Sequence, residues 1–117
     1  MEEGRFPQVS GLVFKYSPLE RKGLRVKEVW IAGKAIDLEQ EYVVATNDFL
    51  AAGGDGYKVF WEALKTSRDY SIMGGSMKGE KIVYSDSGRW LRDVVAEYVR
   101  ETGRIAPKGV GRIVEVR

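Results

Sequence analysis

Residues 42–57 read Tyr-Val-Val-Ala-Thr-Asn-Asp-Phe-Leu-Ala-Ala-Gly-Gly-Asp-Gly-Tyr, and the interpretation of the whole chain depends on this stretch. Its first five residues include tyrosine, valine and threonine, which suit a pleated backbone and predict a strand. Phe49 stands just past the predicted strand end, and Asp55 lies among three glycines that permit positive φ and the close approach of a ligand. An aromatic ring, a tight turn and an acceptor together suit the binding of a flat polar ring that carries hydroxyl groups.

The same residues have a structural interpretation. Gly53, Gly54, Asp55 and Gly56 also have the composition of an ordinary turn, and Phe49 is compatible with a place in a hydrophobic core. From the residues alone the structural interpretation is the commoner one, since short motifs match by chance. Both interpretations stay open at this point.

Length and charge define the broad class of the protein. The chain has 117 residues, of which 44% are hydrophobic and 31% charged, an ordinary composition for a globular protein. Its 19 basic and 17 acidic residues give a formal net charge of +2, which argues against a nucleic-acid partner. No apolar run is long enough to span a membrane. The sequence therefore predicts a single domain over residues 1–117 that has no nucleic-acid partner and no membrane partner.

The missing residue types exclude several chemistries. The chain has no cysteine and no histidine, so disulfides, thiolate chemistry and histidine-containing metal sites are excluded. No dense acidic loop offers a site for a hard cation. We therefore expect no metal or other cofactor in this chain. The N-terminus is acidic and lacks the apolar segment of a secretory signal, so the sequence assigns no compartment.

The spacing of the hydrophobic residues predicts the remaining strands and helices. Alternation and turn residues predict further strands over residues 12–16, 25–31, 34–36, 82–84 and 112–116. A change to helical period predicts helices over residues 58–65, with Val59, Phe60, Ala63 and Leu64 on one face, and 87–102, with Asp86 or Ser87 as N-cap and Gly103 as C-cap. The expected fold is α+β, a mainly antiparallel or mixed sheet with two helices packed on it.

Four blocks, taken together, resemble the C-terminal domain of the 5'-nucleotidase family, which includes UDP-sugar hydrolases. The blocks are residues 4–11 (Gly-Arg-Phe-Pro-Gln-Val-Ser-Gly), residues 45–57 with the glycine turn, Glu97-Tyr98-Val99 and Gly111-Arg112-Ile113. Their order and spacing agree with the family over nearly the whole chain, and the glycine block is the specific one. The resemblance implies a 5'-nucleotidase C-terminal-domain-like fold.

The resemblance also implies roles for individual residues. Phe49 is expected to stack on the base of a nucleoside or nucleotide, and Asp55 is expected to bind the ribose hydroxyls. Gly53 and Gly54 form the turn, and Gly4 is expected near the base edge, a weaker transfer. Phe6 and Asn47 are candidate pocket-lining residues, although Phe6 is equally compatible with core packing.

The departures from the family limit what is expected of the chain alone. The family holds a dinuclear divalent metal site in a separate metallophosphoesterase domain, which this sequence lacks. A second stacking aromatic and the phosphate-binding arginines lie upstream of the Gly-x-Phe block in the family, and neither Arg5 nor Arg112 is assigned to that role. We therefore expect recognition of a substrate in nucleotide catabolism, with no catalysis by this chain alone.

A second hypothesis belongs to a different class. The chain is also compatible with an assembly or interaction module that retains no ligand. Such a module would expose apolar surface and favour association, for example as a homodimer. The sequence does not distinguish the preferred base or sugar, the oligomeric state or the compartment.

Overall fold

The computed structural model describes residues 5–65, 71–73, 76–78, 81–83, 89–107 and 111–117. It consists of two compact units. The sheet unit contains Phe6–Tyr42 and Pro107–Arg117, and the turn unit contains Met1–Arg5 and Val43–Ala106. The single domain over residues 1–117 stays a prediction.

The element order is that of a mixed α+β chain. It runs β1 (Leu12–Tyr16), β2 (Val26–Ile31), β3 (Lys34–Ala35), α1 (Asp48–Ala51), the 3-10 helix η2 (Gly54–Gly56), α2 (Lys58–Lys65), β4 (Ser71–Met73), β5 (Ser76–Lys78), α3 (Leu91–Thr102) and β6 (Ile113–Glu115). The predicted fold class is confirmed. The packing of two helices on the sheet stays a prediction, because the helices and the sheet belong to different units.

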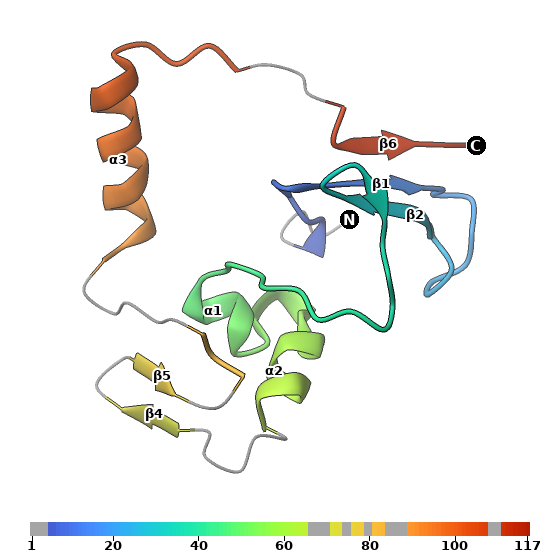
Figure 1. Cartoon of the computed structure of the whole chain (residues 1–117), viewed down its shortest axis with the longest axis horizontal. Helices are drawn as coiled ribbons and strands as arrows, with labels where there is room; N and C mark the ends of the chain where they lie inside the picture. The colour runs from blue at the N-terminus through green and yellow to red at the C-terminus, as the bar shows by residue number, and fades with distance from the viewer. Residues whose placement is uncertain (1–4, 66–70, 74–75, 79–80, 84–88, 108–110) are drawn as a thin grey trace. The chain divides into compact units, whose positions relative to one another are not determined.

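The sheet unit is built around β1, which lies between β2 and β6 in the strand order β3-β2-β1-β6 (Figure 1). β1 pairs with β2 antiparallel and with β6 parallel, and β2 pairs with β3 antiparallel. The sheet is therefore mixed, with its C-terminal strand β6 beside its first strand. The β1–β2 register shifts between Lys15 and Tyr16, since Lys15 pairs with Glu28 and Tyr16 pairs with Val26.

Local sequence explains the hairpin between β2 and β3. Ala32 and Gly33 have φ values of 52° and 77°, and two successive positive φ values define the two-residue hairpin turns that match strand twist. The turn pairs Ile31 with Lys34. The predicted hairpin at Ala32-Gly33 is confirmed, with a return strand one residue shorter than expected.

The buried hydrophobic core found among the described residues lies in the sheet unit. Phe14, at the centre of β1, is 7% exposed and is the only buried hydrophobic side chain among them. Its ring lies 6.1 Å from that of Tyr16, which Phe6 contacts edge-on at 5.4 Å. On the other side of β1, Lys15 pairs with Glu28 at 3.1 Å. The predicted strand over Leu12–Tyr16 is thus confirmed.

The predicted strand over Tyr42–Thr46 is wrong. These residues form no described strand, and Val43 and Val44 are 80% and 62% exposed. The Tyr42 hydroxyl accepts a hydrogen bond from the Asp37 N–H at 3.0 Å, so the chain is tied to its own preceding turn. β propensity measures fit to a neighbouring strand, and here no strand among the described residues pairs with the segment.

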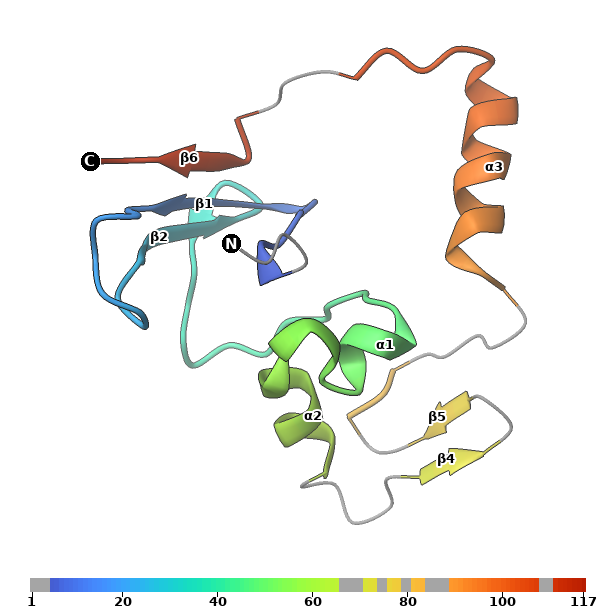
Figure 2. The ribbon, with the colours of Figure 1, turned by 180° about the vertical axis from the view of Figure 1, so that it is seen from behind.

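The two longer helices agree with the sequence in part. α2 has the predicted bounds, but only Phe60 and Leu64 of its predicted face are half-buried, and Val59 is 65% exposed. α1 contacts α2, and the two helices lie side by side in both views (Figure 2). The helix after residue 87 begins at Leu91, with Trp90 at its N-cap and no side-chain cap bond, and the predicted caps Asp86 and Ser87 lie outside the described residues.

The C-terminal end of α3 behaves as predicted. Gly103 has a φ of 72° and its N–H donates to the Val99 carbonyl at 2.8 Å. Ile82 and Val83 of the predicted strand 82–84 are not in a strand, so that prediction is wrong where it is described, and Tyr84 lies outside the described residues. No helix in the described part of the chain is both long and apolar enough to cross a bilayer.

Candidate functional site

The candidate site begins at α1, whose start is fixed by a side-chain cap. Asn47 has an extended backbone, and its Oδ1 accepts from the Leu50 N–H at 2.9 Å. Asp48 Oδ1 accepts from the Phe49 N–H at 2.9 Å. Asparagine and aspartate favour such helix starts because their short side chains satisfy free N–H groups. These bonds hold the backbone of Phe49 at the beginning of a short helix.

The glycine turn follows α1 at once and uses left-handed backbone conformations. Gly53 and Gly56 have φ values of 92° and 79°, and between them Asp55 has a φ of 52° and a ψ of 23°. Glycine adopts such values without strain, and aspartate tolerates them better than most residues. The turn therefore places a carboxylate at a position where a branched side chain would be strained.

Gly54 is required for a different reason, the close approach of Phe49. A Cβ on Gly54 would lie 2.6 Å from Cε1 and Cζ of the Phe49 ring and 2.6 Å from the Phe49 carbonyl oxygen. The ring edge thus lies against the turn backbone. Phe49 is nevertheless 57% exposed, so it is not a core residue, and much of its surface is open to a ligand.

Asp55 is exposed, and its charge reaches the next aromatic residue. The pKa of the Tyr57 hydroxyl is raised above its ordinary value, mainly by burial and further by the negative charge of Asp55. A carboxylate raises the pKa of a phenol only when it is close, because its field falls off quickly in water. The Asp55 carboxylate therefore lies within electrostatic reach of the Tyr57 hydroxyl.

Contacts of Tyr57, the residue directly after Gly56, support the glycine turn. The Tyr57 ring stacks on Phe60 of α2 with a centroid distance of 6.3 Å and an interplanar angle of 19°. The Tyr57 hydroxyl donates to the Arg5 carbonyl oxygen at 3.3 Å. Sequence reasoning missed both Tyr57 and Arg5 in this arrangement. The available signal for Tyr57 was its position directly after the glycine block.

The other predicted site residues are distributed as follows. Gly4 lies outside the described residues. Phe6 belongs to the sheet unit, where its ring packs against Tyr16, and its role as pocket lining stays a prediction. Asn47 serves as the cap of α1. The turn unit therefore holds Phe49, Gly53, Gly54 and Asp55 in one continuous segment.

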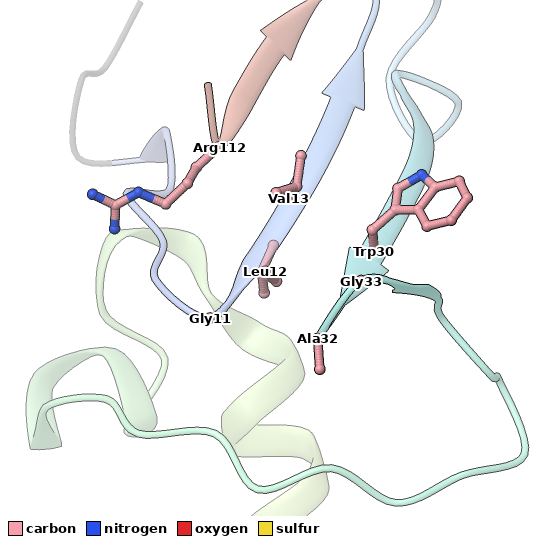
Figure 3. Close-up of a pocket in the computed structure, with 7 residues that line it drawn as sticks. All are labelled: Gly11, Leu12, Val13, Trp30, Ala32, Gly33 and Arg112. Carbon is pink, nitrogen blue, oxygen red and sulfur yellow. The ribbon is translucent and has the colours of Figure 1, made fainter. Parts of the chain in front are cut away.

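A separate hollow lies in the sheet unit and contains none of these residues. It measures about 230 Å³ and is lined by Gly11, Leu12, Val13, Trp30, Ala32, Gly33 and Arg112 (Figure 3). Its two polar side chains point in opposite directions and have partners within the sheet unit. Arg112 donates to the Val9 carbonyl at 2.9 Å, and the Trp30 indole N–H donates to Glu28 at 3.1 Å. We therefore take the glycine turn as the candidate site.

The described residues of this chain do not fit a dinuclear metal centre, which the resemblance places in a separate domain. It has no histidine and no cysteine. Among the residues that the structure describes, no group of three or more acidic side chains is placed to hold a metal ion.

The family model and the similar proteins all concern 5'-nucleotidases or related phosphoesterases. Residues 1–62, which include all of the predicted site residues, match the family described as 5'-nucleotidase, C-terminal domain. The chain is 36% identical over 119 residues to the trifunctional nucleotide phosphoesterase protein YfkN of Bacillus subtilis (strain 168), an alignment that covers 97% of this chain and 7% of that protein. It is 28% identical over 119 residues to the snake venom 5'-nucleotidase of Naja atra, over 95% of this chain and 19% of that protein.

These alignments also define the extent of the likeness. The chain spans less than a fifth of the length of either relative. No solved structure matches it significantly.

Proposed function

The chain belongs to the family of 5'-nucleotidase C-terminal domains, and on that premise we propose that it is the nucleoside-recognising portion of a 5'-nucleotidase-like phosphohydrolase in nucleotide catabolism. The base stacks on Phe49, and Asp55 accepts hydrogen bonds from the ribose hydroxyls. The observation that carries the proposal is the arrangement at the glycine turn, where an exposed aromatic ring and an exposed carboxylate stand on one short segment.

The chemistry of both side chains suits a nucleoside. Stacking of a base on an aromatic ring contributes about 1–3 kcal/mol and tolerates different bases. A carboxylate that accepts from two hydroxyl groups forms charge-assisted bonds, which are stronger than neutral ones. The glycines beside Asp55 carry no side chains that would obstruct a sugar. Gly53 and Gly54 thus contribute space and backbone shape.

Catalysis is assigned to another domain. The relatives are named as phosphoesterase and nucleotidase over lengths that far exceed this chain. This chain has no histidine, and its described residues include no group of three or more acidic side chains placed to hold a metal ion. We propose that a metallophosphoesterase domain, on the same or another polypeptide, supplies the metals and the hydrolytic step. Incubation of the purified chain with AMP and a divalent metal is expected to release no phosphate, and turnover above background would contradict this.

Calorimetric titration with adenosine tests the binding roles. Phe49→Ala is expected to weaken adenosine binding about tenfold to a hundredfold, the equivalent of the stacking energy. Trp90→Ala is the matched control, because Trp90 is also 57% exposed and lies in the turn unit. Equal affinity of wild type and Phe49→Ala would remove the stacking role.

The test of Asp55 needs variants that keep its backbone conformation. Asparagine and glycine both tolerate the left-handed φ of 52° at this position, so Asp55→Asn and Asp55→Gly separate the loss of the carboxylate from backbone strain. Both are expected to weaken adenosine binding about tenfold. Asp93→Asn, an exposed acid on α3, serves as the control and should leave the affinity unchanged.

The second candidate function, an assembly module without a ligand, has one observation in its favour. Apolar residues of α3 that share one face are exposed among the described residues, with Leu91 64%, Val95 51% and Tyr98 59% exposed. Surfaces of this kind favour association. Light scattering that shows a dimer, combined with no detectable adenosine binding, would favour this candidate over the first.

A further inference from the structure

The inference concerns Arg5 and rests on the proposed function. The stretch of residues 42–57 carries two carboxylates and no basic residue, so by itself it offers acceptors for hydroxyl groups and no cationic donor for the acceptor oxygens of a nucleotide. The fold brings a cation to it from 52 positions away, since the Tyr57 hydroxyl bonds the Arg5 carbonyl.

The Arg5 side chain lies along the glycine turn. A Cβ on Gly56 would lie 3.5 Å from Nε and 3.9 Å from both Cδ and Cζ of Arg5. Gly56 directly follows Asp55 in the chain, so the Arg5 side chain lies along the same turn that carries the carboxylate proposed to hold the ribose. These are ordinary van der Waals distances, so the Arg5 side chain packs against the turn at Gly56, whose φ is 79°.

We infer that Arg5 determines specificity at this site by donating hydrogen bonds to an acceptor oxygen of the ligand. The guanidinium group is planar, always charged and a donor only, so it favours a ligand oxygen that is a carbonyl or an anion. A nucleoside offers such an oxygen either as a base carbonyl or, when phosphorylated, as a phosphate. Arg5 therefore biases the site toward ligands that carry one of these groups, relative to adenosine, which carries neither.

Three ligands separate the two sources of the oxygen. Adenosine has no base carbonyl and no phosphate, inosine replaces the amino group by a carbonyl, and AMP adds the phosphate. Calorimetric affinities are measured for wild type and Arg5→Gln. The substitution leaves the backbone carbonyl that Tyr57 uses, so the support of the turn is retained.

The expected result is a selective loss. Arg5→Gln weakens binding of either inosine or AMP about fivefold to tenfold, as the loss of a charged hydrogen bond at an exposed site predicts, and leaves adenosine within about twofold. A loss confined to inosine assigns the oxygen to the base, and a loss confined to AMP assigns it to the phosphate. Arg5→Lys, which keeps the charge without the planar fork, is expected to restore part of the AMP affinity.

The control is Lys58→Gln, which removes the same charge from the residue that directly follows the 42–57 stretch. If Lys58→Gln reproduces the selective loss, or if Arg5→Gln changes all three ligands equally or none of them, the role of Arg5 is overturned. Failure of the proposed function is seen separately, because wild type would then bind none of the three ligands, and this inference would fall with it.

Discussion

The two units of the chain are held together by different physical means. The sheet unit depends on strand pairing and on one buried aromatic residue, Phe14. In the turn unit the described helices contain no buried residue, and the turn is shaped by left-handed backbone, a helix cap and a ring pressed against a glycine. Burial thus stabilises the sheet, whereas backbone geometry specifies the candidate site. Different substitutions should therefore damage the two units.

The largest expected effect is on the sheet unit. Phe14→Ala removes its buried ring and is expected to lower the free energy of unfolding by about 3–5 kcal/mol, measured by urea denaturation. Val26→Ala, on the neighbouring strand but 58% exposed, is the control and should cost about 0.5 kcal/mol or less. Similar losses for the two variants would mean that burial at Phe14 does not dominate the sheet.

In the turn unit the expected damage comes from added bulk. Gly54→Ala places a methyl group in contact with the Phe49 ring and carbonyl, which is expected to cost about 1–3 kcal/mol and to weaken adenosine binding. Gly103→Ala has a positive φ of 72° but open space around it, so it reports left-handed strain alone, about 1 kcal/mol, without an effect on binding. Unchanged binding by Gly54→Ala would separate the turn from the site.

The two units also differ in how well sequence predicts them. The alternating pattern predicts the strand Leu12–Tyr16 correctly, because successive side chains of a strand point to opposite faces and this gives the sequence a period of two. The same residue preferences mislead at Tyr42–Thr46, where no described strand provides a partner. Strand propensity records suitability for a sheet, and a partner strand is a separate requirement.

At the candidate site the sequence predicts the components better than their geometry. The glycines indicate a turn, and the resemblance selects Phe49 and Asp55. Neither indicates that Asp55 itself is left-handed or that Gly54 is needed for contact with Phe49. The approach of Arg5 to Gly56 is set by tertiary structure between distant segments, which composition and local period do not encode.

A smaller effect is expected at the cap of α1. Asn47→Ala removes the acceptor for the Leu50 N–H and should cost about 1 kcal/mol. Asn47→Asp keeps an acceptor and is the matched control. Urea denaturation and adenosine affinity, measured together, show whether the cap also positions Phe49. If Asn47→Asp lost as much stability as Asn47→Ala, the capping role would be contradicted.

The smallest effect is electrostatic. The pKa of Tyr57 is raised first by burial and then by Asp55, so Asp55→Asn should lower it part of the way toward its ordinary value of about 10. Because the folded-state pKa is raised, the associated stability is present below about pH 10 and is lost as pH rises through the folded-state value. Ultraviolet titration of the phenolate, with Tyr57→Phe subtracted, measures the shift. Asp93→Asn should leave it unchanged.

The central claim is that Phe49 and Asp55 face the same bound nucleoside, and nuclear Overhauser effects between protein and adenosine test it most directly. Contacts are expected from the Phe49 ring protons to the protons of the adenine base, and from the amides of Gly54 and Gly56 to the ribose protons. Adenosine contacts confined to the sheet unit, or base contacts that do not involve Phe49, would contradict it.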